Sequence, residues 1–200
     1  MDIFSYLCLR LLTNKTSFMK KLLTLLTLML MLPMVTFAQV QEKKPQTTFE
    51  KFTSSLGIMM KFVDYGLPNV KSDYSEAKAI VRKVIKNNES QCFLRISFTD
   101  YNSQAHCAFI AYNDVVELKK ALDELKKQVV NEVIGEAYYL ENKFTTRDNL
   151  EIGYYISKDK SGEKVPSWVI TIDNESLFFK DASVLSTLFD NAIQKMNAVK

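Results

Sequence analysis

The chain has 200 residues, of which 47% are hydrophobic, and it carries a formal net charge of +3. It is long enough to bury a hydrophobic core without the support of disulfides. Its single histidine and its lack of CxxC and HExxH spacings exclude the common zinc motifs, and its few glycines form no phosphate-binding loop.

Residues 19–38 have the features of a secretory signal peptide. Lys20-Lys21 precede a run of leucine and methionine, and the segment closes with Thr36-Phe37-Ala38. This order of a cationic start, an apolar core and a small residue at the cut predicts cleavage before Gln39. A membrane anchor, the alternative, needs about 20 apolar residues, and Pro33 ends the run early. We therefore expect a periplasmic or extracellular protein with no membrane span after cleavage.

Cleavage of the signal also changes the charge of the chain. Residues 1–18 lie upstream of a complete signal that begins with Met19, so we interpret them as a start site placed too early. Residues 1–38 hold four of the 26 basic residues and one of the 23 acidic residues, so the chain from Gln39 is formally neutral. Because nucleic-acid binders rely on an excess of positive charge, this balance argues against a nucleic-acid partner.

After a flexible lead-in at residues 39–48, residues 49–200 are predicted to form a single α+β domain. It is predicted to contain two repeats, at about residues 49–132 and 133–200, each an antiparallel four-strand meander followed by an amphipathic helix (ββββα twice). Period-two alternation of apolar residues and short turn signals support the strands. The strands of the first repeat are predicted at residues 58–63, 79–86, 92–98 and 106–112. Those of the second are predicted at residues 137–144, 150–157, 168–172 and 177–180.

Amphipathic helices are predicted at residues 115–130 and 182–198, where apolar residues recur at steps of three and four. Asp114 and Asp181 are placed to cap their N-termini. Aligning these two aspartates superimposes apolar positions of the two helices and predicts an internal repeat at a spacing of 67 residues. The superimposed pairs are Leu118 with Leu185 and Leu122 with Phe189.

Two successive units of four strands and a helix resemble, in the order of their elements, the repeats of the Whirly and PUR single-stranded nucleic-acid-binding proteins. The resemblance covers most of the predicted domain and rests on no sequence motif. It implies an architecture, and no functional residue is transferred from those families.

Cys92 and Cys107 remain after cleavage, and an oxidising compartment could join them. A hairpin turn near Asn102 would instead pair Ser97 with Cys107, which leaves the sulfurs too far apart for a disulfide. We therefore expect two reduced thiols, with a bridge only if the turn lies elsewhere. His106 precedes Cys107, but neighbours on a strand point to opposite faces, so we expect a strand-end histidine near solvent and no catalytic dyad.

Four aromatic residues are the candidate binding residues. Phe93, Phe109, Tyr155 and Phe178 could share the sheet face opposite the core, where an exposed apolar patch would mark an interaction surface. The alternative is that these rings are buried between the sheets or between the two repeats.

The leading interpretation is an exported binding or structural module for a protein, a peptide or an envelope component. No catalytic residue, cofactor or metal is predicted. An exported hydrolase with converging carboxylates and a nucleic-acid-binding repeat are the alternatives. The binding module predicts a shallow aromatic surface, the hydrolase a concave pocket with two carboxylates of shifted pKa, and the nucleic-acid binder a lysine-lined groove on a sheet.

Overall fold

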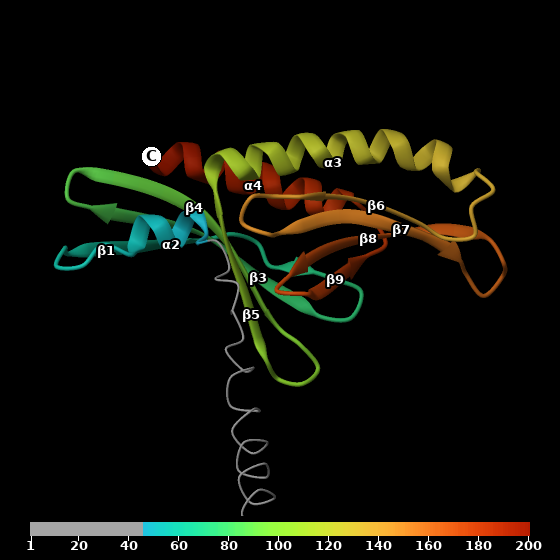
Figure 1. Ribbon diagram of the computed structural model, residues 1–200, viewed down its shortest axis with the longest axis horizontal. Coiled ribbons are helices and arrows are strands. Elements are labelled where there is room, and N and C mark those ends of the chain that lie inside the picture. The colour runs from blue at the N-terminus through green and yellow to red at the C-terminus, as the bar shows by residue number, and fades with distance from the viewer. Residues whose placement is uncertain (1–45) are drawn as a thin grey trace, which may run out of the picture. The chain divides into compact units, whose positions relative to one another are not determined.

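The computed structural model describes residues 46–200, which form two antiparallel sheets and three helices (Figure 1). The predicted signal peptide at residues 19–38, the upstream segment 1–18 and most of the predicted lead-in lie outside the described residues. Within residues 46–200, no helix is both long enough and apolar enough to cross a membrane.

The first sheet follows a short helix, α2 (Thr48–Thr53). Its strands are β1 (Met60–Gly66), β2 (Val70–Lys71), β3 (Glu76–Lys86), β4 (Glu89–Thr99) and β5 (Ala105–Ala111). The order across the sheet is β1-β3-β4-β5, and β2 pairs with β3. The long helix α3 (Tyr112–Val133) follows β5 directly.

The second sheet has the same meander order and also ends in a helix. Its strands are β6 (Leu140–Thr145), β7 (Glu151–Lys158), β8 (Lys164–Ile172) and β9 (Glu175–Phe179), and they are followed by α4 (Ser183–Val199). The predicted α+β fold of two strand–helix units is confirmed, with the bounds of the elements shifted by a few residues. Two short elements, α2 and β2, were not predicted.

The helix α2 begins inside the segment that was expected to be a flexible lead-in. The Thr47 hydroxyl accepts the backbone N–H of Glu50, and the Glu50 carboxylate accepts the backbone N–H of Thr47. This reciprocal pair is a capping box, which satisfies two donors that a helix start leaves free. Thr47 and Thr48 therefore belong to the helix start rather than to a flexible lead-in.

The two long helices begin differently from each other. The prediction that Asp114 caps α3 is wrong, because β5 leads into the helix without a loop and Ala111 occupies the cap position. Asp114 instead lies buried in the first turn, where desolvation and the nearby charge of Asp148 raise its pKa. Asp181 does not occupy the cap position of α4 either, because that residue is Ala182, but the Asp181 carboxylate accepts the backbone N–H of Ser183, the first residue of the helix, at 2.7 Å.

The two units pack crosswise. The helix α4 of the second unit packs on β3 and β4 of the first sheet, whereas α3 of the first unit extends over β6 and β7 (Figure 1). A single hydrophobic cluster draws on both sheets and both helices. The superimposed helix positions Leu118, Leu122, Leu185 and Phe189 are all fully buried in it. Each unit therefore completes its core with parts of the other.

The β4–β5 hairpin has the predicted register, with Ser97 opposite Cys107 and Phe98 opposite His106. Cys92 and Cys107 are both free thiols, as expected from that register. Successive residues of β5 point to opposite faces of the sheet. His106 thus lies on the inner side with Phe98, and Cys107 lies on the other side.

Candidate functional site

The outer face of the first sheet consists of the alternate residues of β1, β3, β4 and β5 that point away from the main core. Its centre combines aromatic rings with arginines. Phe62 and Asp64 come from β1, Arg82 from β3, Arg95 from β4 and Phe109 from β5. The sheet thus displays charged and aromatic groups on the side that α3 and α4 do not cover.

The helix α2 covers part of this outer face. Phe93 is fully buried there, in an edge-on contact with Phe49 at 5.1 Å between ring centroids and a tilted contact with Phe52 at 6.2 Å. Phe49 also stacks on Phe109, with the centroids 3.8 Å apart and the ring planes 7° from parallel. Of the two alternatives left open by the sequence, Phe93 is therefore buried, and the rings that cover it come from α2. Phe109 remains partly exposed at the margin of the cluster.

Two guanidinium groups lie near the Phe109 ring. The central carbon of Arg82 lies 5.5 Å from its centroid and that of Arg95 lies 5.9 Å from it. Both distances fall within the range of cation–π attraction. Arg82 also donates two hydrogen bonds to the Asp64 carboxylate, at 2.6 and 2.7 Å. Arg95 donates its Nε–H to the Cys107 sulfur at 3.3 Å.

The outer face is positive around these two arginines. The hydrogen bond from Arg82 holds the pKa of Asp64 below its usual value, and the charges of Arg82, Arg95 and Lys78 act in the same direction. The same hydrogen bond raises the pKa of Arg82. Within residues 46–200, Arg95 has no carboxylate partner, whereas Arg82 has Asp64. The face therefore offers one guanidinium whose charge is not neutralised by a partner.

The other two predicted residues lie on the second sheet. The rings of Tyr155 and Phe178 are tilted to each other at 6.4 Å, and Tyr139 lies 6.0 Å from Tyr155. Burial and the nearby Glu141 carboxylate raise the pKa of Tyr155. Lys143 pairs with Glu141 at 3.2 Å and with a second glutamate at 3.1 Å. The four predicted residues thus form two separate groups, and their role in binding stays a prediction.

Two concave regions within residues 46–200 can be compared with the pocket that the hydrolase alternative predicts. A cavity of about 340 Å³ beside β4 and the start of α3 has no acidic residue in its lining. A groove of about 430 Å³ between α3 and β6 is lined by Glu117 and Glu124 among other residues. Asp114, whose pKa burial raises, lines neither of them.

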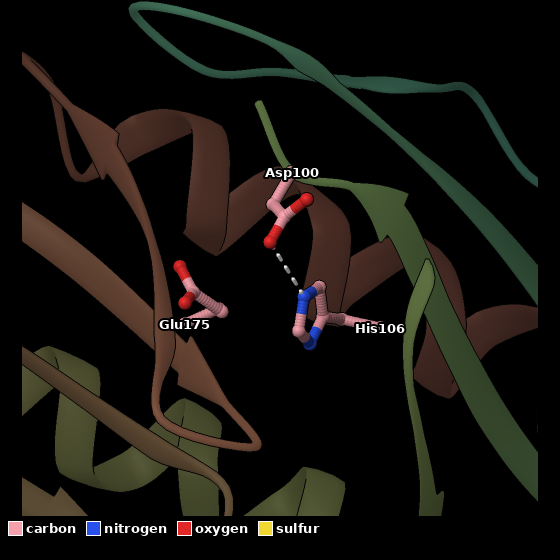
Figure 2. Close-up of side chains that lie close together, drawn as sticks. All are labelled: Asp100, His106 and Glu175. Atoms are coloured by element: carbon pink, nitrogen blue, oxygen red, sulfur yellow. Dashed lines mark hydrogen bonds and ion pairs between the residues drawn. The ribbon is translucent and has the colours of Figure 1, made fainter. Parts of the chain in front are cut away.

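A third group of polar side chains joins the two units. Asp100 follows β4, His106 lies on β5, and Glu175 is the first residue of β9 (Figure 2). His106 Nε2 lies 3.3 Å from Asp100 Oδ2, and one potential ligand atom from each residue lies within 4.8 Å of the others. The His106 side chain is only 11% exposed and that of Asp100 only 5%. The expectation of a solvent-exposed histidine is therefore wrong.

Part of this group had a signal in the sequence. Asp100 and His106 flank the β4–β5 turn, and Asp100 Oδ1 accepts the backbone N–H groups of Asn102 and Gln104. These bonds and the one to His106 lower the pKa of Asp100, against the opposing effect of desolvation. Aspartate is common at such turns because its side chain can bond to backbone two residues on. Glu175 had no comparable signal, since only the fold brings β9 to this turn.

No known protein family, no curated protein and no solved structure matches the chain. The similarity of its element order to the Whirly and PUR repeats therefore stays a prediction about architecture.

Proposed function

We propose that the protein is an exported binding module, and that the outer face of its first sheet binds an acidic peptide segment of a partner protein. The observation that carries this proposal is Arg95, a partly buried guanidinium that lies over Phe109 and has no carboxylate partner within residues 46–200. A guanidinium forms its strongest contacts with carboxylate or phosphate groups. The signal-peptide pattern at residues 19–38 supports export.

The surroundings of Arg95 favour an acidic peptide over a nucleic acid. The Asp64 carboxylate already accepts two hydrogen bonds from Arg82. Arg95 is therefore the arginine at the centre of the face that has no carboxylate partner, and Lys78 lies nearby. A nucleic acid presents a phosphate at every nucleotide and binds through several cations at once. One unpaired guanidinium next to aromatic rings can bind one carboxylate of a peptide, and the rings can contact the apolar side chain that follows it.

Exposed apolar groups near the arginines could hold the rest of such a peptide. Phe62 is 48% exposed, and its ring lies 5.7 Å from the central carbon of Arg82. Apolar side chains of this kind can contact a peptide on either side of a charged anchor.

The test is a selection of peptides from a random displayed library on the purified protein. We expect the selected peptides to share an aspartate or glutamate. Their affinity, measured by fluorescence anisotropy with synthetic labelled copies, should fall at least about tenfold in Arg95→Gln, since hydrogen bonds to charged groups are worth about 1.5–3 kcal/mol.

Arg147→Gln is the matched control, because Arg147 is an exposed arginine in the turn between β6 and β7. It should bind the selected peptides like the unchanged protein. Selected peptides without acidic residues, or equal affinities for Arg95→Gln and Arg147→Gln, would contradict the proposal. A labelled deoxythymidine oligomer that binds more tightly than the peptides, and depends on Arg95, would support the nucleic-acid alternative instead.

A further inference from the structure

The group formed by Asp100, His106 and Glu175 combines an imidazole with two carboxylates at the junction of the two hairpins (Figure 2). Within residues 46–200, neither carboxylate forms an ion pair with a lysine or an arginine. Two negative charges this close repel each other unless a cation lies between them. A metal ion bound between them would remove this repulsion.

Contacts within the first unit hold two of the three potential ligands in place. Asp100 Oδ1 is held by the N–H groups of Asn102 and Gln104, so Oδ2 is left to face His106. The His106 ring stacks on Phe98 with the centroids 5.2 Å apart. Such second contacts orient the ligands of metal sites in proteins.

Glu175 is placed by the tight turn between β8 and β9. Ile172 pairs with Glu175, which leaves Asp173 and Asn174 as a two-residue loop, and both have positive φ, at 51° and 67°. This conformation is typical of the turns that best join twisted antiparallel strands. The carboxylate of Glu175 thus comes from a rigid hairpin rather than from a long loop.

The distances suit a small divalent ion. A tetrahedral zinc ion with bonds of about 2.0–2.1 Å holds its ligand atoms about 3.3 Å apart. The separation between His106 Nε2 and Asp100 Oδ2 is 3.3 Å. The Glu175 oxygen lies within 4.8 Å of both, so a rotation of its side chain can bring it into the same shell. Imidazole with carboxylate is a ligand set that zinc accepts.

We propose that Asp100, His106 and Glu175 bind a divalent transition-metal ion, with zinc as the best fit, and that this ion links the β4–β5 hairpin of the first unit to the β8–β9 hairpin of the second. Three protein ligands leave a fourth position for water. This site is independent of the outer face of the first sheet, because it lies on the inner side of β5.

The test uses the unusual fact that His106 is the only histidine in the chain. Protein prepared without a histidine tag and stripped of metal with a chelator is titrated with zinc chloride while the two ring C–H signals are followed by NMR. We expect both signals to shift and to saturate at one zinc per chain. Calorimetry should show affinities reduced at least about tenfold in Glu175→Gln and in Asp100→Asn, whose Oδ1 can still accept the two turn hydrogen bonds.

Glu163→Gln is the matched control, since Glu163 is an exposed glutamate in the turn between β7 and β8. It should bind zinc like the unchanged protein. Ring signals that do not respond to a tenfold excess of zinc, or that respond equally in Glu175→Gln, would overturn the proposal.

Discussion

The two strand–helix units bury apolar residues at the same helix positions on their inner sides, but their outer sheet faces carry different types of residue. Leu122 of the first helix and Phe189 of the second are both fully buried at superimposed positions. On the outer sides, the first sheet carries Arg82 and Arg95 near Phe109 and is partly covered by α2, whereas the second carries tyrosines and glutamate–lysine pairs. The shared core therefore constrains the inner positions, whereas the outer faces, which lie outside that core, differ in residue type.

The strongest test of the shared core is to truncate both superimposed positions. Leu122→Ala should lower the free energy of unfolding by about 2–5 kcal/mol and Phe189→Ala by about 3–5 kcal/mol. Because α3 and α4 pack crosswise, each variant should still unfold in a single transition in urea. Leu56→Ala, at a side chain that is 95% exposed, is the control with little expected change. Separate transitions for the two units would contradict a common core.

The next test compares one glycine from each sheet. A Cβ on Gly153 of β7 would lie 2.2 Å from the Asn142 carbonyl oxygen, whereas a Cβ on Gly66 of β1 would meet nothing within 4 Å. Gly153→Ala should therefore destabilise the protein by about 1–3 kcal/mol in urea denaturation, as overpacked sites do. Gly66→Ala should stay within about 0.5 kcal/mol of the unchanged protein. Equal losses of stability in Gly153→Ala and Gly66→Ala would mean that β6 and β7 do not approach each other closely at Gly153.

A smaller effect is expected for the helix that distinguishes the first outer face. Thr47→Ala removes the hydroxyl that accepts the N–H of Glu50 and should cost about 1 kcal/mol. In Thr47→Ala, the backbone amide hydrogens of α2 should exchange faster than in the unchanged protein, and the increase should be larger there than in the rest of the molecule. Thr187→Ala, at an exposed position inside α4, should cause no such loss. Unchanged exchange in α2 would show that the capping box does not hold this helix.

The smallest effects concern the pH dependence of stability, which should differ in sign between two aspartates. Burial raises the pKa of Asp114. The charged carboxylate therefore destabilises the folded protein once the pH exceeds the pKa that Asp114 has in the unfolded chain. Compared with the unchanged protein, Asp114→Asn should thus be more stable at about pH 7 than at about pH 3. Arg82 lowers the pKa of Asp64, whose contribution is lost as the pH falls, so Asp64→Asn should be relatively less stable at about pH 7. Thermal melts across this range measure both, and parallel pH profiles would contradict these assignments.

The fold was largely predictable because each strand and long helix repeats its apolar residues with its own period. The turn near Asn102 also gave the correct register of Cys107. The two-residue β2 is too short to show a period. The helix α2 had its signal in Thr47 and Glu50, but a six-residue helix has little amphipathic pattern.

The candidate sites were less predictable because they depend on tertiary contacts. Alternation placed Phe93 on the face opposite the main core, but it could not show that α2 covers that face. The pairing of Arg82 with Asp64 follows from the register of β1 on β3, which the chain order alone does not specify. Glu175 reaches Asp100 only because the two hairpins meet.

The measurement that tests the proposed function most directly is chemical-shift mapping of a selected acidic peptide on the isotope-labelled protein. We expect the signals of Arg95 and Phe109 to change most, together with those of their neighbours on β4 and β5. The signals of Tyr155 and Phe178 on the second sheet should stay in place. Changes centred on Tyr155 and Phe178, with Arg95 unaffected, would contradict the assignment of binding to the outer face of the first sheet.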